Sequence, residues 1–270
     1  MSWCKDMFGQ EKPIIALLHL NAFPGDPLFQ DGDSMKKTVE DARMDLHALQ
    51  DGGVDGILFS NEFSLPYQRK IDYIGPAAMA RVVGELMSEI RIPYGIDCES
   101  DNLAAIDLAA AIDAYFVRAT FTGAYAGDTG ITEPDIAAVL RRKKQLGLKD
   151  LKLFYFLNNE SDEYLVHREL ESIAKSIIFT CRPDGFCIMG AYAGQEASSE
   201  WLSEVRGSIG GVPVFCGTGC KAETVARKLA VSDGAFVGTT FKVNGDFNNH
   251  IDPKRVKKFM EQVDLYRSRQ

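Results

Sequence analysis

Three polar side chains of this sequence have the types and positions that proton-transfer chemistry needs. His19, Glu62 and Asp97 each stand at or just after the end of an apolar run rich in β-forming residues. An imidazole ionises near neutral pH, and two facing carboxyl groups can divide acid and base work, because burial and mutual repulsion separate their pKa values. We therefore predict Glu62 and Asp97 as an acid/base pair and His19 as a proton shuttle. Arg118, at the end of a fourth run, is predicted to orient the substrate.

Each of these side chains also has alternative interpretations. His19 could be held by a neighbouring backbone group, and each carboxylate could cap a helix or form an ion pair. A buried Arg118 is costly unless paired, so it either binds a substrate anion or pairs with Glu62 or Asp97. A divalent metal bound by His19, Glu62 and Asp97 is a further alternative, although the sequence contains no local metal-binding motif.

Two Gly/Thr clusters near the end of the chain suggest a phosphate site. Gly217-Thr218-Gly219 and Gly238-Thr239-Thr240 each follow an apolar run, and a helical segment separates them. Glycines let backbone N–H groups approach an anion without obstruction, although they also simply permit tight turns. We predict that both clusters bind phosphate, that Asn61 and Asp128 contribute to substrate binding, and that Lys242 either adds a charge or lies on the surface.

Lysine is missing where one class of enzyme requires it. Lys152 lies near the start of the fifth apolar run, and no lysine ends the sixth. A Schiff-base aldolase needs a lysine at the catalytic end of such strands, so we do not expect that mechanism.

The positions of these residues depend on a repeating pattern of strands and helices. Strands that alternate with helices form a parallel sheet, and eight units predict an α/β fold, a single closed (β/α)8 (TIM) barrel over residues 1–270, with the phosphate site after strands 7 and 8. We expect no strand outside the barrel, and long loops at residues 21–34, 61–75 and 121–134. The predicted strands are 14–20, 56–60, 94–98, 115–120, 151–157, 185–189, 212–216 and 233–237, and the predicted helices are 35–50, 77–90, 103–112, 135–146, 163–180, 199–209, 222–230 and 253–267.

Composition narrows the class of protein. The chain has 270 residues, of which 46% are hydrophobic and 25% charged, and its net charge is −8. No Lys/Arg run of the nucleic-acid-binding kind occurs, and no apolar run is long enough to cross a membrane, so we expect neither partner. The six cysteines form no C-x-x-C pair and read as reduced thiols of a cytoplasmic protein. A homo-oligomer is expected, as for many barrels.

The sequence as a whole resembles the BtpA/SgcQ family. The resemblance rests on the Pro24–Pro27 loop, the segment Ser60-Asn-Glu-Phe-Ser-Leu-Pro-Tyr67, Arg118 with Phe121–Tyr125, and the two terminal glycine clusters. It spans essentially the whole chain and is greater to the SgcQ branch than to the photosynthetic branch. The sequence departs from the pattern of the family at two positions. The fifth strand ends in apolar and aromatic residues, and the third ends in Asp97-Cys-Glu99.

The resemblance implies a phosphate-binding barrel without fixing its reaction. The SgcQ branch implies carbohydrate metabolism, so we expect an enzyme that acts on a phosphorylated sugar or ribosyl compound as an isomerase, lyase or hydrolase. The photosynthetic branch implies an alternative, a non-catalytic regulatory or assembly factor. No cofactor is implied with certainty, and a divalent metal remains an alternative.

Overall fold

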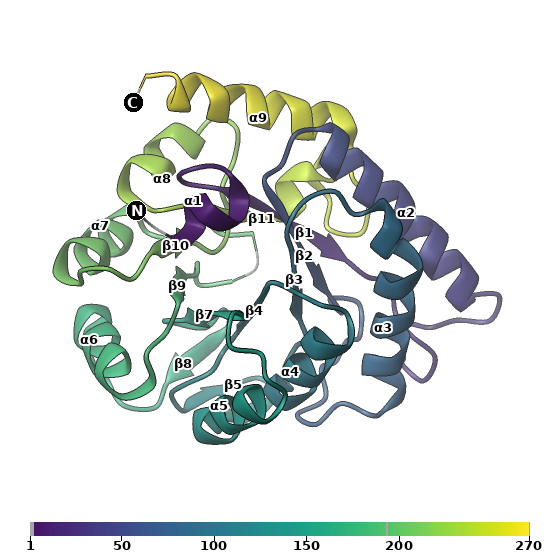
Figure 1. The fold of residues 1–270 in the computed structure, drawn as a ribbon, viewed down its shortest axis with the longest axis horizontal. Helices are drawn as coiled ribbons and strands as arrows, with labels where there is room; N and C mark the ends of the chain where they lie inside the picture. Colours follow the sequence, from purple (N-terminus) through teal and green to yellow (C-terminus); the bar gives the residue numbers. More distant parts are fainter. Residues whose placement is uncertain (1–2, 193, 270) are drawn as a thin grey trace.

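The computed structural model describes residues 3–192 and 194–269 and contains a closed parallel barrel (Figure 1). Around the ring the strands follow the order β1-β11-β10-β9-β7-β4-β3-β2, which confirms the predicted (β/α)8 architecture. Their bounds are β1 Ile14–His19, β2 Gly56–Ser60, β3 Tyr94–Asp97, β4 Phe116–Ala119, β7 Lys152–Phe156, β9 Gly185–Ile188, β10 Val214–Cys216 and β11 Ala235–Val237.

Helices form the outer ring around these strands (Figure 1). Several begin at a polar residue that accepts a backbone hydrogen bond, as Ser34 does from Lys37 and Asp101 from Ala104. These caps explain why the helices begin where the apolar periodicity starts. The bounds are α2 Met35–Asp51, α3 Ile74–Leu86, α4 Asn102–Ala111, α5 Ile136–Gln145, α6 Leu170–Cys181, α7 Ser199–Ser208, α8 Val225–Val231 and α9 Pro253–Arg267.

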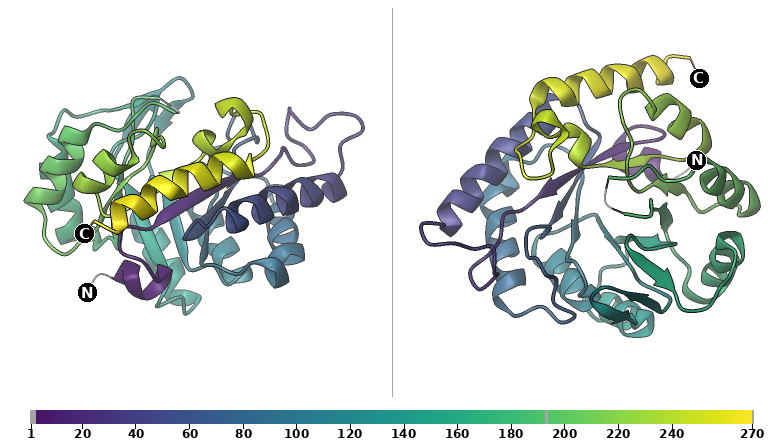
Figure 2. Two further views of the ribbon diagram at one scale, coloured as in Figure 1. Left: turned by 90° about the horizontal axis from the view of Figure 1, so that it is seen from above. Right: turned by 180° about the vertical axis from the view of Figure 1, so that it is seen from behind.

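The core consists of two separate apolar clusters, as the alternation of side chains along each strand requires. One lies between the barrel and the helices, and the other fills the barrel interior with rings such as Phe116, Phe154 and Phe236. The N-terminal helix α1 (Trp3–Phe8) closes the bottom of this interior, because the ring of Trp3 lies 5.4 Å from that of Phe154. Figure 2 shows α1 on the same side of the molecule as both chain ends.

Three short strands outside the barrel were not predicted. β5 (Tyr125–Gly127) pairs with β6 (Gly130–Thr132) and with β8 (Asp162–Tyr164) in an antiparallel sheet. The prediction of a plain loop over 121–134 was therefore wrong, as was the helix from 163, since α6 begins at Leu170. The rings of Tyr125 and Tyr164 pack 4.9 Å apart across this sheet. This tertiary packing outweighs the local helical pattern.

Strand register determines which side chains meet at the mouth of the barrel. His19 is level with Ser60 on β2, and Ser60 is level with Asp97 on β3. The carboxyl ends of all eight strands point to one face, opposite α1. The longest connections lie there, so this face holds the candidate site. None of the helices in the described part of the chain is long and apolar enough to cross a membrane.

Candidate functional site

Four of the predicted side chains lie at the mouth of the barrel. His19, Asp97 and Arg118 are 7%, 1% and 3% exposed, and the side chain of Glu62 is 16% exposed. Each comes from, or just after, one of the neighbouring strands β1 to β4, which explains why residues far apart in sequence share one site.

Glu62 lies between His19 and Tyr67. Its Oε1 is 3.9 Å from Nε2 of His19, and its Oε2 accepts a hydrogen bond of 2.8 Å from the hydroxyl of Tyr67. Burial lowers the pKa of His19 to about 4, with smaller contributions from the positive charges of Lys242 and Arg118, and Glu62 opposes the shift. The imidazole is therefore neutral at neutral pH, and it can both donate and accept a hydrogen bond.

Asp97 and Arg118 form a buried ion pair. Nε and Nη2 of Arg118 donate to Oδ2 of Asp97 at 3.1 and 3.0 Å, and the guanidinium lies 5.1 Å from the ring centres of both Phe156 and Phe236. Burial raises the pKa of Asp97 to about 6, although Arg118 opposes the shift. Of the alternatives for Arg118, the structure therefore shows pairing with Asp97. These contacts make Asp97 the residue that positions Arg118, and its acid/base role stays a prediction.

Two further carboxyl groups lie close to this pair, and sequence reasoning gave them little or no weight. Glu99 interacts with Asp97, and burial followed by the charge of Asp97 raises the pKa of Glu99 well above its usual range. Burial also raises the pKa of Glu160 to about 7. The sequence does indicate Glu99, through its spacing of two after Asp97, as a carboxylate candidate ranked behind Glu62 and Asp97. Glu160 lies in the loop between β7 and β8, where the sequence carries no comparable signal.

The glycine clusters follow β10 and β11, and the second of them borders His19 because β11 pairs with β1. A Cβ added at Gly217 would overlap Sδ of Met189, one at Gly219 would overlap the backbone of Gln195, and one at Gly238 would lie 3.1 Å from Nε2 of His19. Only glycine fits these positions without displacing a neighbour.

Two threonine hydroxyls of the clusters already have protein partners. Oγ1 of Thr218 accepts a hydrogen bond of 2.6 Å from the amide of Gly190, and Oγ1 of Thr240 donates one of 2.7 Å to the carbonyl of Cys220. Thr239 begins a 3₁₀ helix (η2, Thr239–Phe241), and the first N–H groups of a helix have no acceptor within it. Any phosphate contact at the second cluster therefore involves backbone amides more than hydroxyls.

Lys242 is buried beside the second cluster and does not lie on the surface. It is 2% exposed, its Nζ donates to the carbonyl of Asn249 at 3.0 Å, and it lies 5.4 Å and 5.5 Å from the ring centres of Phe63 and Phe247. Burial lowers its pKa. The ring of Phe247 also packs 5.1 Å from that of His19, so loops after β2 and β11 cover the imidazole.

Of the other two residues predicted to bind substrate, Asn61 lies in the buried group at the mouth and Asp128 does not. Asn61 is 1% exposed, and its Oδ1 accepts a hydrogen bond of 2.7 Å from the amide of Glu99, so it fixes the backbone after β3. Asp128 is exposed in the turn between β5 and β6, outside the buried group. Across residues 3–192 and 194–269, no three His, Cys, Asp or Glu side chains are placed to hold a metal ion together.

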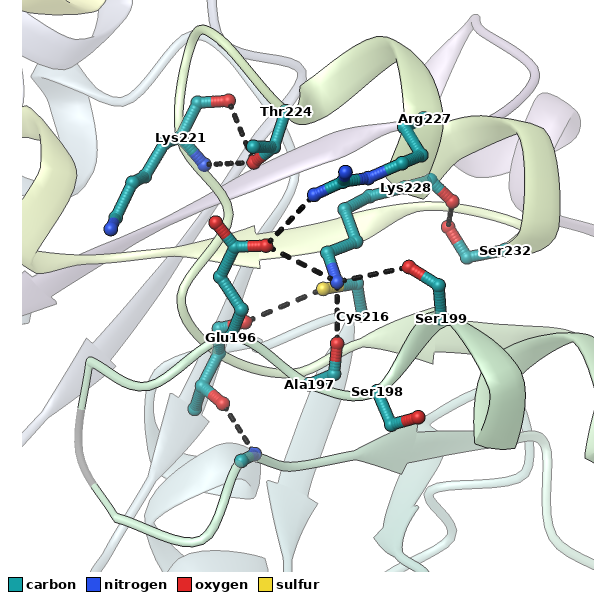
Figure 3. Close-up of polar contacts among 12 residues, drawn as sticks. Glu196, Ala197, Ser198, Ser199, Cys216, Lys221, Thr224, Arg227, Lys228 and Ser232 are labelled. Carbon is teal, nitrogen blue, oxygen red and sulfur yellow. Dashed lines mark hydrogen bonds and ion pairs between the residues drawn. The ribbon is translucent and has the colours of Figure 1, made fainter.

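A buried lysine supports the first glycine cluster from behind (Figure 3). Nζ of Lys228 donates to the carbonyl of Ala197 at 2.5 Å and to Oγ of Ser199 at 3.1 Å, and it lies 3.4 Å from a carboxylate oxygen of Glu196. The amide of Ala197 in turn donates to the carbonyl of Thr218. Lys228 thus connects α8 through the loop after β9 to the Gly217–Gly219 cluster.

Known proteins resemble this chain in sequence or in fold. The model of the BtpA family matches residues 10–265. The putative sgc region protein SgcQ of Escherichia coli is 43% identical over 97% of this chain and 98% of its own length, and the photosystem I biogenesis protein BtpA of Synechocystis is 28% identical over 95% and 89%. A phosphoribosyl anthranilate isomerase from Thermococcus kodakaraensis has the same fold, with a TM-score of 0.56, 12% identity and coverage of 93% and 98%. The chain therefore belongs to the BtpA family.

Proposed function

We propose that this protein is an enzyme that acts on a phosphorylated sugar or ribosyl compound by proton transfer at the carboxyl-terminal face of the barrel. The observation that carries the proposal is a group of buried polar atoms at the mouth that have no hydrogen-bond partner in the described part of the chain. They are Nδ1 and Nε2 of His19, Oγ of Ser60, Nη1 of Arg118 and Oε1 of Glu160.

Such atoms are costly to leave unsatisfied. Each buried unpaired donor or acceptor destabilises a protein by about 1–3 kcal/mol, so native proteins keep few of them and usually for a purpose. Here five belong to residues at the carboxyl-terminal face of the barrel, where catalysis takes place in characterised TIM-barrel enzymes. A polar ligand that forms hydrogen bonds with these atoms explains why the protein keeps them.

The contacts of Glu62 and His19 suggest how protons move. Glu62 is the base, because Oε2 is held by Tyr67 while Oε1 faces His19 and the mouth. It removes a proton from a carbon or hydroxyl of the substrate. The neutral His19 exchanges a proton with the adjacent substrate oxygen, and in an isomerisation Glu62 returns its proton to the neighbouring carbon. Arg118 donates from Nη1 to a substrate oxygen.

The phosphate group of the substrate binds the backbone amides of the Gly217–Gly219 and Gly238–Thr240 clusters. The buried ammonium group of Lys242 favours an anion there. The phosphoribosyl substrate named for the isomerase of the same fold supports this choice of ligand class, as does the location after the seventh and eighth strands.

Two measurements test the proposal. A panel of aldose and ketose phosphates is incubated with the protein in D2O, and NMR reports deuterium incorporation or conversion. Glu62→Gln is expected to reduce the rate by about 10²–10⁴-fold, whereas the exposed Glu163→Gln leaves it unchanged. Thermal melting is recorded with the same panel, because a ligand well above its Kd raises the melting temperature. If no member of the panel raises it or is converted, the proposal is wrong.

The second candidate function is a non-catalytic regulatory or assembly factor. One observation favours it, namely that the side chain of His19 is only 3% exposed beneath Phe247. The name of the Synechocystis relative points the same way. If a strain that lacks this protein is rescued fully by Glu62→Gln, the catalytic proposal loses its main support and this alternative replaces it.

A further inference from the structure

We infer that Ser60, Arg118 and Glu160 form a subsite for the hydroxyl groups of an uncharged sugar. The substrate would then be a neutral aldose or ketose phosphate, and phosphorylated sugar acids and amino sugars would bind poorly. This inference rests on the proposed function and assigns its substrate class and its specificity residues.

The three residues come from the half of the strand ring that lies across from the glycine clusters. Ser60 ends β2, Arg118 lies on β4, and Glu160 follows β7, whereas the clusters follow β10 and β11. In the ring of strands, β1 lies between β11 and β2, and β9 lies between β10 and β7. A ligand anchored by phosphate at the clusters would therefore extend its other end toward these three residues.

Their unpaired atoms differ in hydrogen-bonding type. Nη1 of Arg118 can only donate, an ionised Glu160 can only accept, and the hydroxyl of Ser60 can do both. A sugar hydroxyl also donates and accepts, so adjacent hydroxyls can satisfy all three atoms. An ammonium group only donates and leaves Arg118 unpaired, and a carboxylate only accepts and leaves an ionised Glu160 unpaired.

The charges around Arg118 agree with a neutral ligand. Asp97 already neutralises its guanidinium, with both donors on one carboxylate oxygen. Burial raises the pKa of Glu99 well above its usual range and that of Glu160 to about 7, so both carboxyl groups carry less negative charge at neutral pH than exposed ones would. A ligand carboxylate would add a buried negative charge beside a guanidinium that Asp97 already neutralises. A ligand ammonium would be brought against the guanidinium.

Glu160 is the residue best placed to exclude a sugar acid. Its Oε1 is buried without a partner, and it is close enough to Arg118 and Glu62 for their charges to act on it. When ionised it repels a carboxylate, and it accepts from a hydroxyl in either protonation state. Gln keeps the size and the accepting oxygen but removes the charge, so Glu160→Gln separates these two effects.

The test compares ligands that share a phosphate and differ at the other end. Ribose 5-phosphate and glucose 6-phosphate are each titrated by calorimetry beside the corresponding phosphorylated aldonic acid and 2-amino sugar, with inorganic phosphate as the reference. We expect at least one neutral sugar phosphate to bind tenfold or more tightly than its acid and amino counterparts. Glu160→Gln is expected to reduce the discrimination against the acid at least threefold, and Ser60→Ala to weaken the neutral sugar without affecting inorganic phosphate.

The possible results separate the inference from the function on which it rests. Equal binding of neutral, acidic and amino sugars, or unchanged ratios in both variants, overturns the inference and leaves the proposed function standing. Tightest binding of an amino sugar also overturns it, in favour of a cation subsite. If no sugar phosphate binds more tightly than inorganic phosphate, both proposals fail. Glu163→Gln serves as the matched control, and circular dichroism confirms that each variant is folded.

Discussion

At the ends of β1 to β4 the barrel mouth is lined by ionisable side chains, whereas at the ends of β10 and β11 it is lined by backbone. On the first side, His19, Glu62, Asp97 and Arg118 lie within one connected group. On the second, Gly217, Gly219 and Gly238 leave no room for a Cβ without moving a neighbour. The first side can change its charge and exchange protons, whereas the glycine clusters of the second present fixed backbone dipoles beside the side chain of Lys242.

This difference indicates how the two sides respond to mutation. A polar side chain on the first side can be replaced by one of equal size without moving the backbone, so chemistry and folding can be separated. A glycine on the second side cannot be replaced without disturbing the packing, so binding and folding are coupled. The Asp97–Arg118 pair is the exception on the first side, since it is a buried ion pair and removal of one partner leaves the charge of the other uncompensated.

The largest effect is therefore expected at that exception. Asp97→Ala leaves Arg118 as an uncompensated buried cation, and breaking such a pair costs about 3–5 kcal/mol of unfolding free energy. Urea denaturation at pH 7 measures the loss. The double variant Asp97→Ala with Arg118→Met removes both charges and is expected to recover more than half of it. A loss below about 1 kcal/mol in the single variant would show that the ion pair contributes little to stability. Asp97 and Arg118 would then behave like the other polar side chains of the first side.

The sequence was most informative where a residue's position follows from the strands. His19, Asp97 and Arg118 could be predicted because they end or nearly end apolar runs, and a parallel barrel brings such ends together. Glu160 and Phe247 could not, because they lie in loops whose paths depend on tertiary contacts. The same limit explains β8, whose pairing with β5 is a contact between distant segments. The barrel was thus more predictable than the details of its mouth.

A pH-dependent effect on stability is expected next, at Glu160. Its pKa in the folded protein is raised to about 7 from 4.5, so the folded state binds more protons than the unfolded state between these values. Stability contributed by this group is present below pH 4.5 and is lost as the pH rises to 7. Glu160→Gln should therefore be more stable than the original protein at pH 8, by up to about 3 kcal/mol, and equal to it near pH 4.5.

Urea denaturation at pH 5 and pH 8 measures this difference. Glu163→Gln, an exposed change of the same kind, should show the same stability relative to the original protein at both pH values. A Glu160→Gln variant that is less stable at pH 8 would mean that the ionised carboxylate has a favourable partner in the folded protein, which would contradict the raised pKa of this group.

A smaller effect on the free energy of unfolding is expected on the glycine side. Gly219 has φ +70°, and a Cβ there would overlap the backbone of Gln195, so Gly219→Ala is expected to cost about 2 kcal/mol of unfolding free energy. It should also weaken the binding of inorganic phosphate. Gly84 in α3 has open space around its Cβ position, so Gly84→Ala should instead stabilise by about 0.5–1 kcal/mol. If both variants behave alike, the packing of the cluster does not restrict it to glycine.

The smallest effect is expected at Tyr67, whose hydroxyl hydrogen-bonds Glu62. Tyr67→Phe removes the hydrogen bond of 2.8 Å to Oε2 and keeps the ring, so Glu62 becomes free to rotate away from the substrate. A hydrogen bond to a charged group contributes about 1.5–3 kcal/mol, and other groups partly replace it, so kcat should fall by about tenfold. KM should stay the same, because Tyr67 positions the base and does not bind the substrate.

The rate of deuterium exchange at saturating and limiting substrate separates the two constants, with Tyr192→Phe, 61% exposed, as the control. A rise in KM with unchanged kcat would place Tyr67 in the substrate site. A side chain that we assign to positioning Glu62 would then itself bind the sugar. The substrate site would therefore extend from the ionisable side into the loop after β2.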